Sequence, residues 1–223
     1  MSLIYCIIQS MASDKSTAKP PRRYTEFSLV TSLHVFNHFE TRSNILLAKN
    51  VYDLTVNDKL DIIISLQILL EAGVNSIIRD LAVHTLKKDI TYVDVAKDLD
   101  SIGFREKTAS FIYGANFEFG KDLPEASSRR RVLGKMQNFT RYRNAIMHGH
   151  TIATQSINGT RSSTVLHDIL EDDEAFKRHV KQYAEIINDF KFYVEHLSNE
   201  SIDKDKLVKS YLRMPLSLKR FIA

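Results

Sequence analysis

Hydrophobic residues recur every three or four positions along most of the chain, which is the spacing of one face of an α-helix. The clearest run spans 58–82, with Leu60, Ile63, Leu66, Leu70, Val74, Ile77 and Leu81 on one wide stripe. Because this segment is apolar on most sides, we expect it at the centre of the protein, with Thr55 or Asn57 as its N-cap. Similar patterns predict further helices over 25–48, 91–101, 104–114, 125–147, 172–197 and 203–213.

Two segments depart from the helical pattern. Residues 1–24 end in a Pro-Pro-Arg-Arg run, and we interpret them as a disordered or loosely attached leader. Residues 151–165 are rich in Thr, Ser and Ile around Asn158-Gly159, a dipeptide favoured in two-residue turns, and predict a small β-hairpin. The remainder, 25–223, is predicted to form a single all-α helical bundle that carries this hairpin.

The composition agrees with a helical domain. The chain has seven Gly and four Pro among 223 residues, which argues against a β architecture with many tight turns. The lone cysteine, Cys6, cannot form an internal disulfide. No apolar run is expected to reach the roughly 18 residues of a membrane span, so the sequence predicts a cytoplasmic protein with no membrane partner.

The net charge of +4 is too small to identify a partner, but the charges are unevenly distributed. Six basic residues and no acid lie between 129 and 143, namely Arg129, Arg130, Arg131, Lys135, Arg141 and Arg143. Cations along one helix attract a polyanion and release its counterions, so this run is a candidate RNA-binding surface. Tyr142 could stack on a base there. A solvated helix face without a ligand is the alternative interpretation.

One of these basic residues, Arg143, falls in an apolar row of the predicted helix 125–147. It lies 11 residues after Val132, within roughly 20° of the same direction around the helix. An unpaired buried guanidinium costs several kcal/mol, so Arg143 needs a partner or a task. Glu71 is the candidate partner, because it is aligned with Gln67 and Val74 on the central helix rather than on a solvated face.

The segment Arg143-Asn144-Ala145-Ile146-Met147-His148 resembles the R-x4-6-H motif of the HEPN superfamily. His148 is expected at the end of the motif helix, since Gly149 after it permits the left-handed conformation that ends helices. A histidine at a helix C-terminus gains from the helix dipole in its charged form. This suits a group that exchanges protons near neutral pH.

The resemblance implies a HEPN-like bundle that acts as a metal-independent endoribonuclease, with no cofactor and no metal. The 2′-hydroxyl of RNA would attack the adjacent phosphate, with His148 as general acid or base. Arg143 would neutralise the phosphate oxygens, and Asn144 would orient His148 or the phosphate. The resemblance also implies a homodimer through the motif helix, with two copies of the motif facing each other.

Other HEPN-like proteins have lost catalysis, so a non-catalytic module that binds RNA, a nucleotide or a protein is the main alternative. The family resemblance also suggests a toxin or antiviral defence protein, with an antitoxin or inhibitor protein as partner. Some toxins of this type carry a tyrosine two residues after the histidine, whereas this chain has His150. A third interpretation is an unrelated helical regulator in which Arg143 is merely ion-paired.

Overall fold

The computed structural model describes residues 25–86, 102–114, 126–147, 155–157, 160–162, 165–196 and 203–223. These residues are predominantly helical, so the predicted all-α class is confirmed. The predicted leader 1–24, the helix expected over 91–101 and the motif residue His148 lie outside the described residues.

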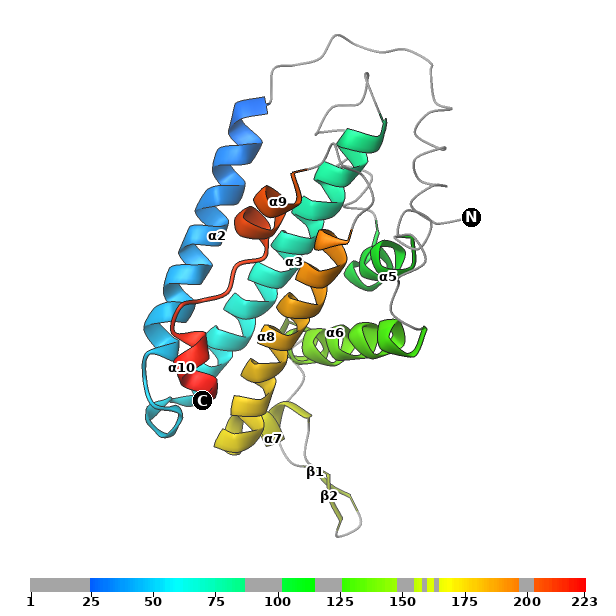
Figure 1. Ribbon diagram of the computed structural model, residues 1–223. Coiled ribbons are helices and arrows are strands. Elements are labelled where there is room, and N and C mark those ends of the chain that lie inside the picture. The colour runs from blue at the N-terminus through cyan, green and yellow to red at the C-terminus, as the bar shows by residue number, and fades with distance from the viewer. Residues whose placement is uncertain are drawn as a thin grey trace.

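Three long helices form the body of the molecule (Figure 1). Helix α3 (Val56–Leu86) lies between α2 (Thr25–Leu47) and α8 (Asp173–Glu195), and α6 (Ala126–Met147) crosses α3 and α8 with α5 (Phe104–Gly114) beside it. The shorter elements are the 3-10 helix η1 (Val51–Asp53), the strands β1 (Gln155–Ile157) and β2 (Thr160–Ser162), and the helices α7 (Val165–Glu171), α9 (Lys204–Tyr211) and α10 (Leu218–Ile222). Helix α3 is the central helix of the bundle, because it packs against α2, α5, α6, α7, α8 and α9.

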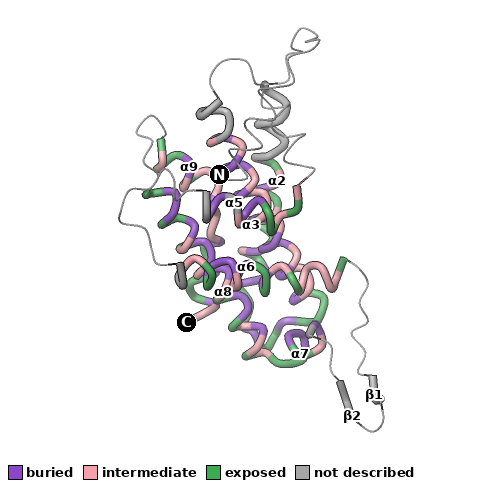
Figure 2. Tube along the Cα trace, turned by 90° about the vertical axis from the view of Figure 1, so that its right-hand side faces the viewer, coloured by how far each residue is buried: buried purple, intermediate pink, exposed green. Residues whose placement is uncertain are grey.

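The core follows the inner faces of α3 and α8, as the buried segments in Figure 2 indicate. The predicted central position of α3 is confirmed: Leu60 and Leu81 are partly buried, and the other stripe residues are completely buried. These are Ile63, Leu66, Leu70, Val74 and Ile77. Burying one such side chain contributes about 1.5–3 kcal/mol, so this stripe stabilises the whole bundle.

No apolar run of membrane-spanning length was expected from the sequence, but helix α3 contains one. Its segment Val56–Leu81 is long and apolar enough to cross a membrane by length and composition, with a mean hydropathy of 1.6. However, 67% of the qualifying stretch is buried inside the protein. Packing against the surrounding helices accounts for this apolar composition, as it does for the central helices of helical bundles.

The ends of α3 and α8 are set by side-chain caps. Thr55 is the cap of α3: its Oγ1 accepts from the N–H of Asp58 at 3.1 Å, and the Asp58 carboxylate accepts from the N–H of Thr55 at 3.1 Å. Asp172 caps α8 by accepting from the N–H groups of Ala175 at 3.0 Å and Glu174 at 2.9 Å. These backbone hydrogen bonds hold the pKa of the Asp172 carboxyl below its ordinary value.

The predicted hairpin is present, and two short helices are additions to the prediction. Strands β1 and β2 pair antiparallel with Ile157 opposite Thr160, and the predicted turn residues Asn158 and Gly159 lie outside the described residues. Helix α7 fills the interval between the hairpin and α8, and α10 follows α9. Each of these two helices is too short to show several periods of a hydrophobic pattern, which is why the sequence analysis missed both.

The C-terminal segment packs tightly on the long helices. A Cβ atom on Gly73 of α3 would collide with the backbone carbonyl oxygen of Tyr211, so α9 approaches α3 closely only because residue 73 has no side chain. The Tyr183 hydroxyl of α8 donates to the carbonyl oxygen of Arg213 at 2.6 Å. The Arg213 guanidinium in turn contacts Glu40 of α2 at 3.2 Å. The end of the chain therefore ties three long helices together.

Candidate functional site

The structure brings Arg143 and Glu71 together across the contact between α6 and α3. Arg143 Nη2 lies 3.7 Å from Glu71 Oε2, and the two side chains are 34% and 23% exposed. Arg143 Nη1 also donates to Asn144 Oδ1 at 3.0 Å. Because 3.7 Å exceeds the length of a hydrogen bond, Arg143 and Glu71 attract each other through their charges and do not form a bidentate hydrogen-bonded pair. Glu71 thus offsets the burial of the arginine while leaving most of its donors to other groups.

Glu71 belongs to a longer chain of polar contacts, which we call the polar network. Gln67 Nε2 donates to Glu71 Oε1 at 2.8 Å and to Thr140 Oγ1 at 3.3 Å. Gln67 is fully buried, so its contacts fix how α3 and α6 face each other. No role was predicted from the sequence for Gln67 or Thr140. The detectable signal was a glutamine in the most apolar stretch of α3, since a buried amide is usually hydrogen-bonded.

A cavity of about 590 Å³ lies beside this network, between α5, α6 and the start of α7. Its lining combines apolar, amide, hydroxyl and arginine side chains, namely Phe104, Arg105, Thr108, Leu133, Met136, Gln137, Asn138, Thr140, Arg141, Asn144, Ala145 and Leu166. Thr140 and Asn144 belong to both the cavity wall and the polar network. The predicted residues Asn144 and Arg141 therefore lie at a cavity, which the sequence analysis did not predict.

Helix α6 carries two parallel stripes with different tasks. The first faces the core and α3, and consists of Val132, Met136, Phe139 and Arg143, of which Met136 also lines the cavity. The second lines the cavity one position later along the chain, and consists of Leu133, Gln137, Thr140 and Asn144. One residue corresponds to about 100° of rotation, so the two stripes lie next to each other on the helix. The site is built where they meet.

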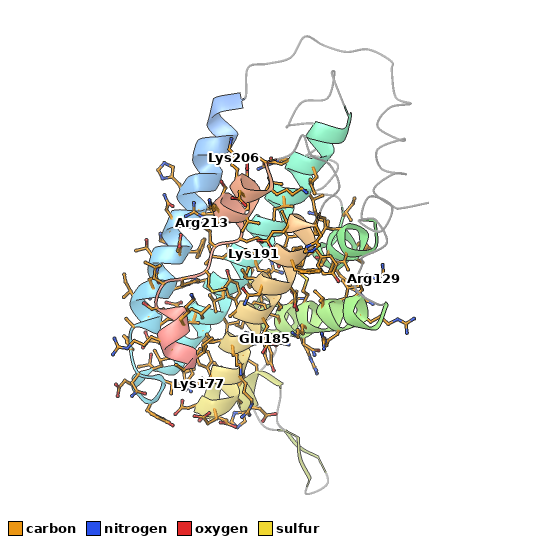
Figure 3. All side chains as sticks on the ribbon, viewed as in Figure 1. Arg129, Lys177, Glu185, Lys191, Lys206 and Arg213 are labelled. Atoms are coloured by element: carbon orange, nitrogen blue, oxygen red, sulfur yellow. The ribbon has the colours of Figure 1, made fainter. Side chains whose placement is uncertain are left out.

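The predicted RNA-binding basic residues are in different surroundings. Arg130, Arg131 and Arg141 are exposed on α6, whereas Arg129, labelled in Figure 3, is half-buried near its start. None of these positions conflicts with contact to a polyanion. Their clustering on one helix is as the sequence indicated.

Lys135, which was predicted to bind RNA phosphates, forms ion pairs with two carboxylates. Its ammonium group lies 2.9 Å from the carboxylate of Glu185 and 3.3 Å from that of Asp189, both on α8. Glu185 is labelled in Figure 3. Burial alone would lower the pKa of Lys135, but the two carboxylates outweigh burial and raise it. Lys135 therefore fastens α6 to α8.

Tyr142 packs into the same contact between α6 and α8. Its ring lies edge-on against the ring of His179, with centroids 4.6 Å apart, and His179 stacks on Phe139 at 4.4 Å. His179 is 3% exposed, and neither of its ring nitrogens has a hydrogen-bond partner among the described residues. Burial lowers the pKa of His179 to about 3, so the ring is neutral at pH 7. Tyr142 thus packs against the core and is only partly buried, and its stacking on an RNA base stays a prediction.

The motif histidine follows directly after the described part of the helix. Helix α6 ends at Met147, whose side chain is 61% exposed, and His148 and His150 lie outside the described residues. Within the described ranges, no three His, Cys, Asp or Glu side chains are grouped so that they could hold a metal ion. The arrangement offers a positioned guanidinium, an adjacent amide and a cavity alongside α6.

No protein-family model, curated protein or solved structure matches the chain. The HEPN resemblance therefore rests on the residues from Arg143 to His148 and on the helical fold.

Proposed function

We propose that this protein is a metal-independent endoribonuclease that cleaves RNA by the mechanism of HEPN ribonucleases. The observation that carries the proposal is the position of Arg143 near the C-terminal end of α6. There it is flanked by Glu71 at 3.7 Å and Asn144 at 3.0 Å, and it is five residues from His148 in the sequence. A cavity that Asn144 also lines provides space for part of a substrate.

The proposed reaction is an internal transesterification. The 2′-oxygen of one ribose bonds to the adjacent phosphorus while the bond from phosphorus to the 5′-oxygen breaks, which gives a 2′,3′-cyclic phosphate and a 5′-hydroxyl. His148 removes the proton of the 2′-hydroxyl or donates one to the leaving 5′-oxygen, a role worth about 10²- to 10⁴-fold in rate. Arg143 stabilises the negative charge on the non-bridging oxygens.

The neighbours of Arg143 act as positioning residues in this scheme. Glu71 holds the guanidinium at the end of α6, and Gln67 holds Glu71 by a hydrogen bond of 2.8 Å. Asn144 accepts a hydrogen bond from Arg143 with Oδ1, so its Nδ2 remains the group that would orient the phosphate or His148.

The proposal includes a homodimer across α6, in which two motifs supply an acid and a base to one cleft. The exposed Met147 at the end of α6 supports an interface there, since an apolar side chain gains from burial against a second copy. Such a ribonuclease fits a toxin or antiviral defence protein of the cytoplasm, restrained by an inhibitor protein.

A second candidate, a non-catalytic module that binds RNA or a nucleotide, is favoured by the ion pair itself. Arg143 already has a carboxylate partner, which satisfies a half-buried guanidinium without any substrate. In this case Arg143 would stabilise the contact between α3 and α6, and only the exposed arginines and the cavity would meet a ligand.

The test is RNA cleavage in the presence of EDTA. Wild type, His148→Ala and Arg143→Ala are compared with His34→Ala, a matched control because His34 is exposed on α2. We expect wild type and the control to give fragments with 2′,3′-cyclic phosphate ends by mass spectrometry. His148→Ala should be slower by about 10²-fold or more. Equal cleavage by wild type and His148→Ala would contradict the proposal. RNA binding without cleavage by the wild type would favour the second candidate.

A further inference from the structure

We propose that the cavity between α5, α6 and α7 binds one unpaired nucleotide of an RNA chain, with the base inside and the phosphate at the arginines. The proposal rests on the proposed function in that the bound nucleotide is part of the RNA substrate. Nucleotide binding itself does not require cleavage. The two ideas therefore fail in different experiments.

The size and the apolar wall suit a nucleobase. The volume of about 590 Å³ falls within the roughly 300–1,000 Å³ of small-molecule sites. Five of the twelve lining residues are apolar, namely Phe104, Leu133, Met136, Ala145 and Leu166. Phe104 supplies an aromatic surface of the type on which proteins stack unpaired bases. A planar heterocycle would bury apolar surface against this wall.

The polar groups of the wall suit the edge of a base rather than a purely apolar ligand. Thr108 donates its hydroxyl hydrogen to the Phe104 carbonyl at 2.8 Å, and Thr140 donates to the Met136 carbonyl at 2.9 Å. Both hydroxyls therefore face a ligand only as acceptors. Asn144 has the opposite role, because its Oδ1 accepts from Arg143 and its Nδ2 remains a donor. An apolar ligand would leave the Asn144 Nδ2 donor without a partner in the ligand, and an unsatisfied buried group costs about 1–3 kcal/mol.

The charge of the wall favours a phosphate. Arg105 of α5 and Arg141 of α6 reach the cavity from two helices and are both exposed. None of the twelve described residues that line the cavity is acidic. A guanidinium binds phosphate oxygens in a bidentate fashion, and two of them match a backbone phosphate. The wall thus combines an apolar surface, hydrogen-bonding groups and cations, which are the three parts of a nucleotide site.

Asn144 connects this cavity to the proposed cleavage chemistry. It lines the cavity and also accepts the hydrogen bond of Arg143 at 3.0 Å. A nucleotide seated in the cavity therefore lies next to the residue that holds the phosphate-binding guanidinium. The identity of the base in the cavity would then select which neighbouring phosphodiester reaches Arg143. The side-chain amides of Gln137 and Asn138, which also line the cavity, would take part in this selection.

The first test is calorimetric titration with AMP, GMP, CMP and UMP, using ribose 5-phosphate as the ligand without a base. We expect at least one nucleotide to bind about ten-fold tighter than ribose 5-phosphate. The variants Asn138→Ala and Arg141→Ala should each lower the affinity for this nucleotide by about five-fold or more, consistent with loss of one hydrogen bond or charge contact. Asn188→Ala and Arg220→Ala, at exposed positions on α8 and α10, are the matched controls and should bind as wild type does. Equal binding of all five ligands, or no binding at all, would overturn the proposal.

The second test separates RNA from free nucleotides and the cavity from the nuclease. A hexanucleotide of the preferred base should displace the mononucleotide, and failure to displace it would overturn the RNA form of the proposal. If wild type cleaves RNA, Asn138→Ala should change the preferred cleavage site; an unchanged cleavage pattern would count against the cavity alone. If displacement occurs and no RNA is cleaved, the cavity proposal stands and the nuclease proposal falls.

Discussion

The guanidinium of Arg143 and the carboxylate of Glu71 lie 3.7 Å apart where α6 crosses α3, and neither side chain is more than about a third exposed. Removing only one partner would leave the other charge partly buried and uncompensated, which costs more than the pair contributes. Arg143 and Glu71 therefore act as a unit, and changes at the two positions should be coupled.

Reversing the charge at either position should destabilise the fold, and reversing both should restore part of the loss. We expect Glu71→Arg and Arg143→Glu each to lower the melting temperature. The double variant should show a coupling free energy of about 0.5 kcal/mol or more in a double-mutant cycle of urea unfolding. RNA cleavage should stay absent in the double variant, because the cation would then lie on α3. Additive losses of stability would mean that the two residues do not interact in solution.

Lys135 and the exposed arginines should separate stability from RNA binding. Lys135→Met removes ion pairs to Glu185 and Asp189, so we expect it to lower unfolding free energy by about 0.5–1 kcal/mol with little change in RNA affinity. Replacing Arg130 and Arg131 by Ala should weaken RNA binding with little change in the unfolding free energy. For single-stranded RNA, the slope of log K against log salt should fall by about 0.7 for each lost phosphate contact. A Lys135→Met protein that loses RNA affinity at unchanged stability would contradict this division.

His179 should make the protein sensitive to mild acid. Burial lowers its pKa to about 3 from an ordinary value of 6.5, so the unfolded chain takes up a proton that the folded chain excludes. The stabilisation is complete above pH 6.5 and is lost as the pH falls toward 3. At pH 5 the loss is about 2 kcal/mol. His179→Phe keeps a ring against Phe139 and should abolish this dependence.

The measurement for His179 is urea unfolding at pH 5 and pH 8. The stability of His179→Phe relative to wild type should be higher at pH 5 than at pH 8. His34→Phe, at an exposed position, serves as control and should leave the pH dependence as in wild type. An equal effect of His179→Phe at both pH values would show that His179 is not shielded from solvent.

Gly73→Ala tests the close approach of α9. Helix interiors ordinarily gain from this substitution, by up to about 1 kcal/mol. Here the added methyl group would meet the Tyr211 carbonyl oxygen, so we expect a net loss of about 1–3 kcal/mol in thermal or urea unfolding. Gly134→Ala on α6, where the added atom meets no neighbour, should be neutral or stabilising. A stabilised Gly73→Ala protein would contradict the packing of α9 on α3.

The helices that could be predicted are those whose burial repeats over several turns. The stripes of α3 and α8 are long and regular, and their caps at Thr55 and Asp172 have local sequence signals. The unusual position of Arg143 was also visible, since an arginine interrupts an apolar row. The sequence thus predicted the all-α fold and one pair of contacting residues in the site.

Features that depend on contacts between distant segments could not be predicted. Lys135 has the same appearance in the sequence as its basic neighbours, and only the position of α8 distinguishes it. The only sign in the sequence that His179 is buried is its position in the apolar pattern of α8. The cavity needs α5, α6 and α7 in their final positions, and α7 with seven residues was itself missed. The role of His148 stays a prediction.

The two adjacent stripes on α6 make the helix intolerant of changes in length. Deleting one residue of α6 shortly before Arg143 would rotate the residues after it by about 100° and place Asn144 where Arg143 now lies. Glu71 would then face an amide, and the guanidinium would be lost from the site. Point substitutions in α6 should therefore be far better tolerated over evolutionary time than insertions or deletions of single residues.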